Sequence, residues 1–305
     1  MDLISVLIPA FNAEPYIAIT LNSVVAQTDS CFEVLVVDDG SSDRTREIVR
    51  EFAPRVRLIE QSNCGPAAAR NLLLSEAAGR FVAFLDADDV WNPTKLASQR
   101  RLFEEHPEVV LVSAQLRGID AAGNPSELKE DPRFRSLFDR PQNLHRALLQ
   151  IGNMIGQSTV MAKREVVLAA GGWYAKERIL SGDYELWIRI AEHGPFFVSS
   201  EIVGDYRVLP GSLSHKSLAA EYKGQQRIID MHRSHFTSSE YNRRISKVYD
   251  EWAESAFYEG NPDGWQVWRQ AVSLDPLNLR AWRVGAKHAL VSLLRPGVTD
   301  RRMTS

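Results

Sequence analysis

The sequence predicts an α/β fold with a mostly parallel sheet, followed by a helical segment. Short β-branched runs alternate with amphipathic stretches over the first 114 residues or so. That order is typical of a doubly wound sheet with helices on both faces. Acidic clusters follow several of the apolar runs, and the pattern becomes wholly helical from about residue 217. We therefore expect domains at 1–216 and 217–305.

Each predicted element has a local cause. Phe32–Asp38 is apolar enough for a strand buried on both faces, and Pro9 should stop the first strand. The expected strands are Ile4–Ile8, Phe32–Asp38, Val56–Ile59, Phe81–Leu85, Val109–Ala114 and Ser158–Ala162. The expected helices are 15–26, 44–52, 65–78, about 92–105 and Asp183–His193, each with N-cap or C-cap residues or a one-sided apolar pattern. Residues 116–142 should form a loop with a short hairpin.

Composition excludes several classes of protein. The net charge of −3 gives no basic footprint for nucleic acid. Two cysteines, Cys31 and Cys64, suit free thiols in a reducing compartment better than a disulfide. Apolar runs such as Phe81–Leu85 are far shorter than the ~20 residues of a membrane helix. We expect a cytoplasmic protein, with peripheral contact at the inner face of the membrane left open.

Three acidic clusters lie where ligands bind in such a sheet, at the carboxyl ends of strands or the start of a helix. They are Asp38–Asp43, Asp86–Asp89 and the segment around Asp183. Acids also make turns and caps, so any one cluster has that simpler interpretation. Asp86 and Asp88, two residues apart after a buried strand, can face one hard cation. With a diphosphate completing its ligands, Mg²⁺ or Mn²⁺ would stabilise a negative leaving group.

Long motifs make a family resemblance clear. VLIPAFNAEPYIAITLNSVVAQT, FEVLVVDDGSSDRT and NCGPAAARNLLLSEAAGRFVAFLDADDVWNPTKL resemble family 2 glycosyltransferases of the GT-A fold, over about residues 3–215. The resemblance implies a nucleotide-diphospho-sugar donor. It assigns donor binding to Pro9, Ala10, Phe11, Asp38, Asp39, Gly65, Arg70, Asn71 and Asp86. It makes Asp88 the metal ligand and Asp89 its support, while Arg70 has the alternative of a solvated helix arginine.

The third cluster resembles the acceptor-site motif of the family. Asp183 takes the place of its catalytic base, with a helix N-cap as the alternative role. Gly182 stands where the family usually has Glu, which puts the usual acceptor contacts in doubt. The segments that contain Arg207 and His215 resemble the loop that closes over the diphosphate in the family. Either residue could contact phosphate or metal. An exposed loop histidine is more often without a role.

The C-terminal segment partly resembles a tetratricopeptide repeat. Its aromatic and small residues recur as in such repeats, with spacing about one residue short between Gly260 and Ala271. One repeat cannot form a solenoid alone, so a helical cap is expected, with a partner or membrane surface as the alternative. The Gln225–Ile228 segment lacks the Gln-x-x-Arg-Trp motif of processive members.

The expected function is transfer of one sugar, with inversion, from a nucleotide diphosphate sugar to an acceptor hydroxyl. Surface polysaccharide or glycolipid assembly is the pathway suggested by the family. The alternative is a non-catalytic nucleotide-sugar-binding module that recruits partners through its helices, which Gly182 favours and the three aspartates oppose. A nucleotidyltransferase shares a similar sheet, but the motif order fits it poorly.

Overall fold

The computed structural model describes residues 1–127, 136–175, 182–209 and 218–294. These residues form two compact units. The first holds those within Met1–Leu148 and Gly152–Pro210, and the second those within Leu149–Ile151 and Gly211–Ser305.

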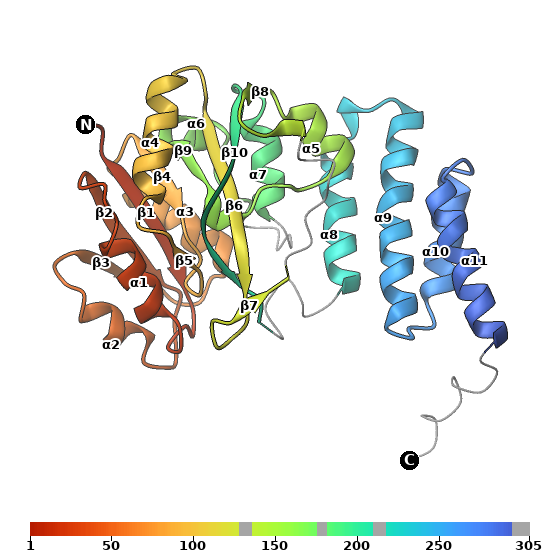
Figure 1. Cartoon of the computed structure of the whole chain (residues 1–305), viewed down its shortest axis with the longest axis horizontal. Helices are drawn as coiled ribbons and strands as arrows, with labels where there is room; N and C mark the ends of the chain where they lie inside the picture. Colours follow the sequence, from red (N-terminus) through yellow and green to blue (C-terminus); the bar gives the residue numbers. More distant parts are fainter. Residues whose placement is uncertain (128–135, 176–181, 210–217, 295–305) are drawn as a thin grey trace, which may run out of the picture. The chain divides into compact units, whose positions relative to one another are not determined.

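The first unit contains one mixed sheet with the strand order β3-β2-β1-β4-β9-β6-β10-β5 (Figure 1). The strands are β1 Ile4–Ala10, β2 Phe32–Asp38, β3 Val56–Glu60, β4 Phe81–Phe84, β5 Val90–Trp91, β6 Leu111–Ile119, β9 Met161–Lys163 and β10 Phe196–Arg207. β1, β2, β3 and β4 are mutually parallel, β9 is antiparallel to β4 and β6, and β10 runs parallel to β6. The short strands β7 Pro125–Ser126 and β8 Pro141–Gln142 pair with β6 and β10.

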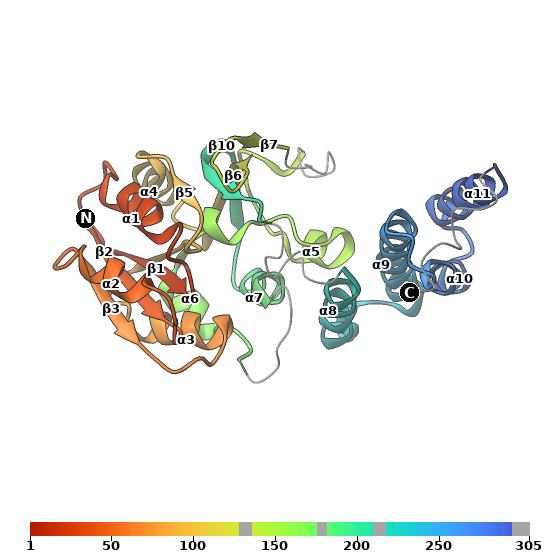
Figure 2. The same cartoon turned by 90° about the horizontal axis from the view of Figure 1, so that it is seen from below.

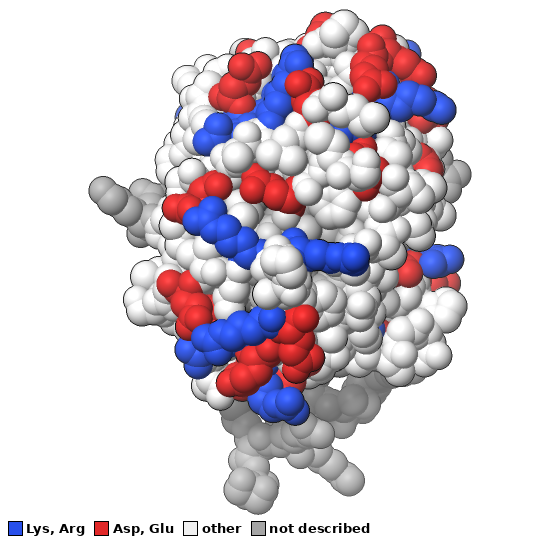
Figure 3. Space-filling view, turned by 90° about the vertical axis from the view of Figure 1, so that its left-hand side faces the viewer, with Lys and Arg blue, Asp and Glu red and all other residues white. Residues whose placement is uncertain are grey.

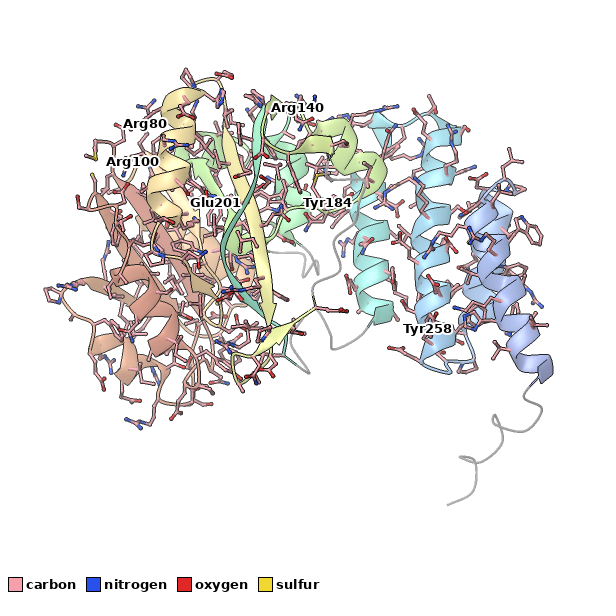
Figure 4. All side chains as sticks on the ribbon, viewed as in Figure 1. Arg80, Arg100, Arg140, Tyr184, Glu201 and Tyr258 are labelled. Atoms are coloured by element: carbon pink, nitrogen blue, oxygen red, sulfur yellow. The ribbon has the colours of Figure 1, made fainter. Side chains whose placement is uncertain are left out.

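Helices cover both faces of this sheet (Figure 2). They are α1 Ile17–Val25, α2 Thr45–Arg50, α3 Pro66–Glu76, α4 Lys95–Glu105, α5 His145–Ile151, α6 Arg164–Ala169 and α7 Gly182–Ile190. Alternate side chains of β1, such as Val6 and Ile8, join α1, α2 and α4 in one apolar cluster. On the other face Phe84 contacts Trp173 and Trp187. Trp187 belongs to α7, which the Tyr184 hydroxyl (Figure 4) ties to the Leu148 carbonyl at 2.8 Å.

The structure differs from the prediction at three places. β1 passes through Pro9 and ends at Ala10, since the proline still offers its carbonyl to the sheet. The predicted strand Ser158–Ala162 is instead a 3₁₀ turn, η2 Gln157–Thr159, followed by β9. The 12-residue strand β10 was not predicted, because polar residues interrupt its apolar pattern. The hairpin expected within 116–142 is formed by β6 and β7.

The second unit is helical where it is described. Its helices are α8 Leu218–Met231, α9 Ser238–Tyr258, α10 Gly264–Leu274 and α11 Leu279–Leu294. Thr237 and Glu240 form a capping box at the start of α9. Small buried residues, Ala256, Ala271 and Ala281, let these helices pack closely. No helix among the described residues is long and apolar enough to cross a membrane.

Candidate active site

Asp38 and Asp39 lie at the carboxyl end of β2, both almost fully buried. The Asp39 carboxylate accepts hydrogen bonds from Gln61 Nε2 at 2.6 Å and from the backbone N–H groups of Cys64 and Gly65 at 2.8 Å. A carboxylate offers about four acceptor positions, so one remains open. Asp38 accepts from Ser41 N–H at 3.0 Å, and its Oδ1 has no partner among the described residues.

Apolar and small residues border the same edge. Pro9 and Ala10 end β1 beside Val37 and Asp38, and Phe11 is 51% exposed. Gly65 has a φ of +89° and no atom within 4 Å of where a Cβ would stand, so the space in front of its backbone is open. An exposed aromatic ring near an open carboxylate position is a surface on which a flat heterocycle can stack.

Arg70 and Asn71, which are neighbours on α3, make contacts with different parts of the protein. Arg70 Nη2 lies 2.9 Å from Asp86 Oδ1, and both side chains are partly exposed. The Asn71 amide donates to the Trp173 carbonyl at 2.7 Å and accepts from its N–H at 2.8 Å. Arg70 therefore faces the acidic centre, whereas Asn71 fixes the turn before α7.

The segment Asp86–Asp89 follows β4 and concentrates three carboxylates. Burial and the charge of Asp86 raise the pKa of Asp88 to about 6. Burial and both neighbouring carboxylates raise the pKa of Asp89 well above its usual range. Among the described residues, no side chain donates a hydrogen bond to the Asp88 carboxylate. Clustered carboxylate oxygens of this kind fit a hard divalent cation.

Asp183 lies at the start of α7, partly exposed. Its Oδ2 lies 3.3 Å from the Asn153 amide nitrogen. Burial raises its pKa, while the Arg70 charge lowers and the Asp86 charge raises it. Asp183 is thus near enough to Arg70 and Asp86 for their charges to act on its pKa. Among the described residues, a Cβ at Gly182 would meet only Trp173 Cδ1, at 3.9 Å.

Arg207 ends β10 and is 4% exposed. Its guanidinium donates to the carbonyls of Asp88 at 2.9 Å, Asp120 at 3.0 Å and Ala121 at 3.2 Å, and lies over the Tyr16 ring. Arg207 therefore stabilises the loop Asp86–Asp89. Its contact with a diphosphate stays a prediction. His215 lies outside the described residues.

Three residues of the site were not predicted: Thr20, Asn153 and Ser158. Thr20 was detectable as a hydroxyl on the otherwise apolar face of α1. Ser158 and Asn153 carry no comparable signal, because each becomes relevant only through contacts with residues far along the chain.

A mixed sheet with two buried aspartates at the end of β2, an acidic pair after β4 and a further carboxylate at α7 fits an enzyme of the GT-A fold. The sequence model described as glycosyl transferase family 2 matches residues 5–166. The chain belongs to this family and is a glycosyltransferase. A relative from Escherichia coli, named UDP-Glc:alpha-D-GlcNAc-diphosphoundecaprenol beta-1,3-glucosyltransferase WfaP, is 31% identical over 70% of this chain and 80% of its own.

Solved structures support the fold. Staphylococcus aureus TarS 1-349 in complex with UDP-GlcNAc superposes with a TM-score of 0.68 at 20% identity, covering 94% of this chain and 88% of its own. The mannosyltransferase PcManGT from Pyrobaculum calidifontis, in complex with GDP-Man and Mn²⁺, gives 0.61 at 20% identity, covering 96% and 81%. At this identity the likeness establishes the GT-A architecture.

Proposed function

We propose that this glycosyltransferase moves one sugar, with inversion, from a nucleotide diphosphate sugar to the hydroxyl of a carbohydrate or lipid-linked acceptor. The observation that carries the proposal is the charged centre of Asp86, Asp88, Arg70 and Asp183, brought together from three elements. The E. coli relative, named for a diphosphoundecaprenol-linked substrate, supports a place in surface polysaccharide or glycolipid assembly.

Each residue has a distinct task in this proposal. The edge formed by Phe11, Asp39 and Gly65 holds the nucleotide base and ribose. Asp88, with Asp86, holds Mg²⁺ or Mn²⁺, whose charge stabilises the departing diphosphate. Asp183 removes the proton from the acceptor hydroxyl as that oxygen attacks the anomeric carbon.

The test is a donor assay with and without divalent cation. We expect nucleoside diphosphate release from UDP- or GDP-sugars in Mn²⁺ or Mg²⁺, little in excess chelator, and little for Asp88→Ala. Full activity in excess chelator contradicts the metal role. Binding of donor without slow hydrolysis or transfer would instead favour the non-catalytic module, the alternative that Gly182 suggests.

The same proposal includes peripheral attachment at the cytoplasmic face of a membrane. Leu279, Trp282 and Leu290 of α11 are 75%, 47% and 58% exposed, and the helix carries basic residues but no acidic one. Exposed apolar and basic side chains on one helix suit an anionic bilayer surface. Sedimentation with anionic vesicles, lost in Leu290→Glu, would support this; equal recovery of the variant would contradict it.

A further inference from the structure

Side chains from three distant elements hold the loop Asp86–Asp89. They are Thr20 of α1, Ser158 of η2 and Arg207 of β10, each at most 4% exposed. Their partners in the loop lie 67 to 119 positions away along the chain. The loop is therefore positioned from outside rather than by its own turn.

Thr20 holds the middle and end of the loop. Its hydroxyl lies 2.9 Å from the Ala87 carbonyl and 2.8 Å from the Asp89 carbonyl, sharing one proton between two acceptors. These two carbonyls flank Asp88. The Asp88 carbonyl itself accepts from Arg207 Nε, so three successive carbonyls of the loop are held.

Ser158 holds the two ends of the same loop. Its hydroxyl accepts from Asp86 N–H at 3.1 Å and donates to Asp89 Oδ2 at 2.5 Å. The second oxygen of Asp89 accepts from the Arg207 N–H at 2.9 Å. Each oxygen of the Asp89 carboxylate thus accepts one hydrogen bond inside the protein, and Asp89 joins η2 and β10 to the loop.

Ser158 is itself held rigidly. Its carbonyl accepts from Trp91 Nε1 at 2.7 Å, and the carbonyl of its neighbour Thr159 accepts from Gln99 Nε2 at 2.7 Å. A hydroxyl fixed in this way imposes a set position on the residues that it contacts. The carboxylates of Asp86 and Asp88, in contrast, receive nothing from Ser158 or Thr20.

We infer that Ser158 and Thr20 are positioning residues that hold the Asp86 and Asp88 carboxylates at the spacing a divalent cation requires. This rests on the proposed metal role of Asp86 and Asp88. Groups that orient ligands from behind typically contribute 10- to 100-fold in metal affinity or activity. Loss of either hydroxyl should therefore weaken cation binding by about tenfold or more.

The test compares Ser158→Ala and Thr20→Val with wild type and with Ser113→Ala. Ser113 of β6 is buried as fully as Ser158, and its hydroxyl has no partner among the described residues, which makes it a matched control. Mn²⁺ affinity is measured by paramagnetic resonance in the presence of UDP or GDP, alongside metal-free nucleotide binding and the melting temperature. We expect Mn²⁺ to bind at least about tenfold more weakly to Ser158→Ala and Thr20→Val, and normally to Ser113→Ala.

Thr20→Ser keeps the hydroxyl and should restore Mn²⁺ affinity, which keeps the test decisive if Ser158→Ala does not fold. A lower melting temperature with Mn²⁺ affinity within twofold of wild type would reduce both residues to a structural role and overturn the inference. If wild type itself binds no Mn²⁺, the metal role in the proposed function fails and the inference fails with it. Wild-type binding with unaffected variants overturns the inference alone.

Discussion

The amide nitrogen of Asn153, in the segment between α5 and η2, lies 3.3 Å from Oδ2 of Asp183 at the start of α7. Asn153, in the segment just before Ser158, therefore donates one hydrogen bond to the Asp183 carboxylate. The charge of Arg70 lowers the pKa of Asp183, and the charge of Asp86 raises it. The Asp183 carboxylate is therefore held by the Asn153 amide and by the Tyr184 backbone N–H.

Asp183→Asn should abolish most transfer while sparing donor binding. Asparagine keeps the shape of the side chain but cannot take a proton, and such bases typically contribute about 10²–10⁴-fold. Donor affinity by calorimetry and product formation with a working acceptor check this. A near-wild-type rate would make Asp183 only a helix cap, with Glu185 the next candidate. Loss of donor binding in a folded variant would place this cluster in the donor pocket.

The same substitution should stabilise the protein at neutral pH. Burial raises the pKa of Asp183 in the folded state. An acid with a raised folded pKa lowers the free energy of unfolding above its unfolded pKa, so removing it helps at pH 7 and has no effect once both states are protonated. Urea denaturation of Asp183→Asn and wild type at pH 7 and at lower pH measures this difference. An equal or lower stability of the variant at pH 7 contradicts the burial of this charge.

Gly182→Glu should be tolerated and should raise the melting temperature. In the part of the chain that the structure describes, a Cβ at this position meets only Trp173 Cδ1, at 3.9 Å, which is an ordinary contact. Glu replaces the poorer helix former and adds negative charge at a helix N-terminus, together worth about 1 kcal/mol. Such a gain corresponds to roughly 2–4 °C in a unit of this size. Scanning calorimetry checks it, with unchanged donor affinity as the control, and a fall in melting temperature would contradict the space seen beside Trp173.

Lys95→Met should stabilise the protein by an amount that falls as pH rises. Lys95 is fully buried, its Nζ 3.5 Å from the Val160 carbonyl and 3.8 Å from the Trp91 ring centroid. Burial lowers the pKa of Lys95 well below 10.5 in the folded state. As pH falls below 10.5, the unfolded state therefore takes up its proton first, which lowers the free energy of unfolding of the wild type. The advantage of the variant should shrink as pH approaches 10.5, where both states of Lys95 become neutral. A pH-independent difference in unfolding free energy would contradict this.

Local patterns predicted the first half of the fold well. β2 has the predicted bounds Phe32–Asp38, since a run of β-branched residues bounded by turn residues has few alternatives. Interactions far along the chain decided the later elements. β10 is a strand because β6 and β5 pair with its two sides, which its own interrupted pattern does not reveal. Gly204 permits the second pairing, because a Cβ there would lie 2.3 Å from the Val90 carbonyl.

Surface charge was also predictable from composition. Acidic and basic side chains are interspersed on the face of the first unit shown in Figure 3, in keeping with the small net charge of −3. The motifs predict where the candidate site lies, but not the contacts that its residues make inside the protein. The ligand-binding roles of Asp39 and Arg207 stay predictions, and both side chains also hydrogen-bond the protein's own backbone.

The ties between Arg207 and the acidic loop have a consequence for folding. Arg207 and Asp88 are 119 positions apart, and Ser158 and Asp89 are 69 apart. Contacts of such long sequence separation form slowly, because much of the chain must be ordered before they close. The loop Asp86–Asp89 should therefore acquire its native shape among the last steps of folding, and during synthesis only after β10 has emerged. A nascent chain that ends before β10 would already carry Asp86, Asp88 and Asp89, but the loop would not yet have the shape in which the proposed cation would bind.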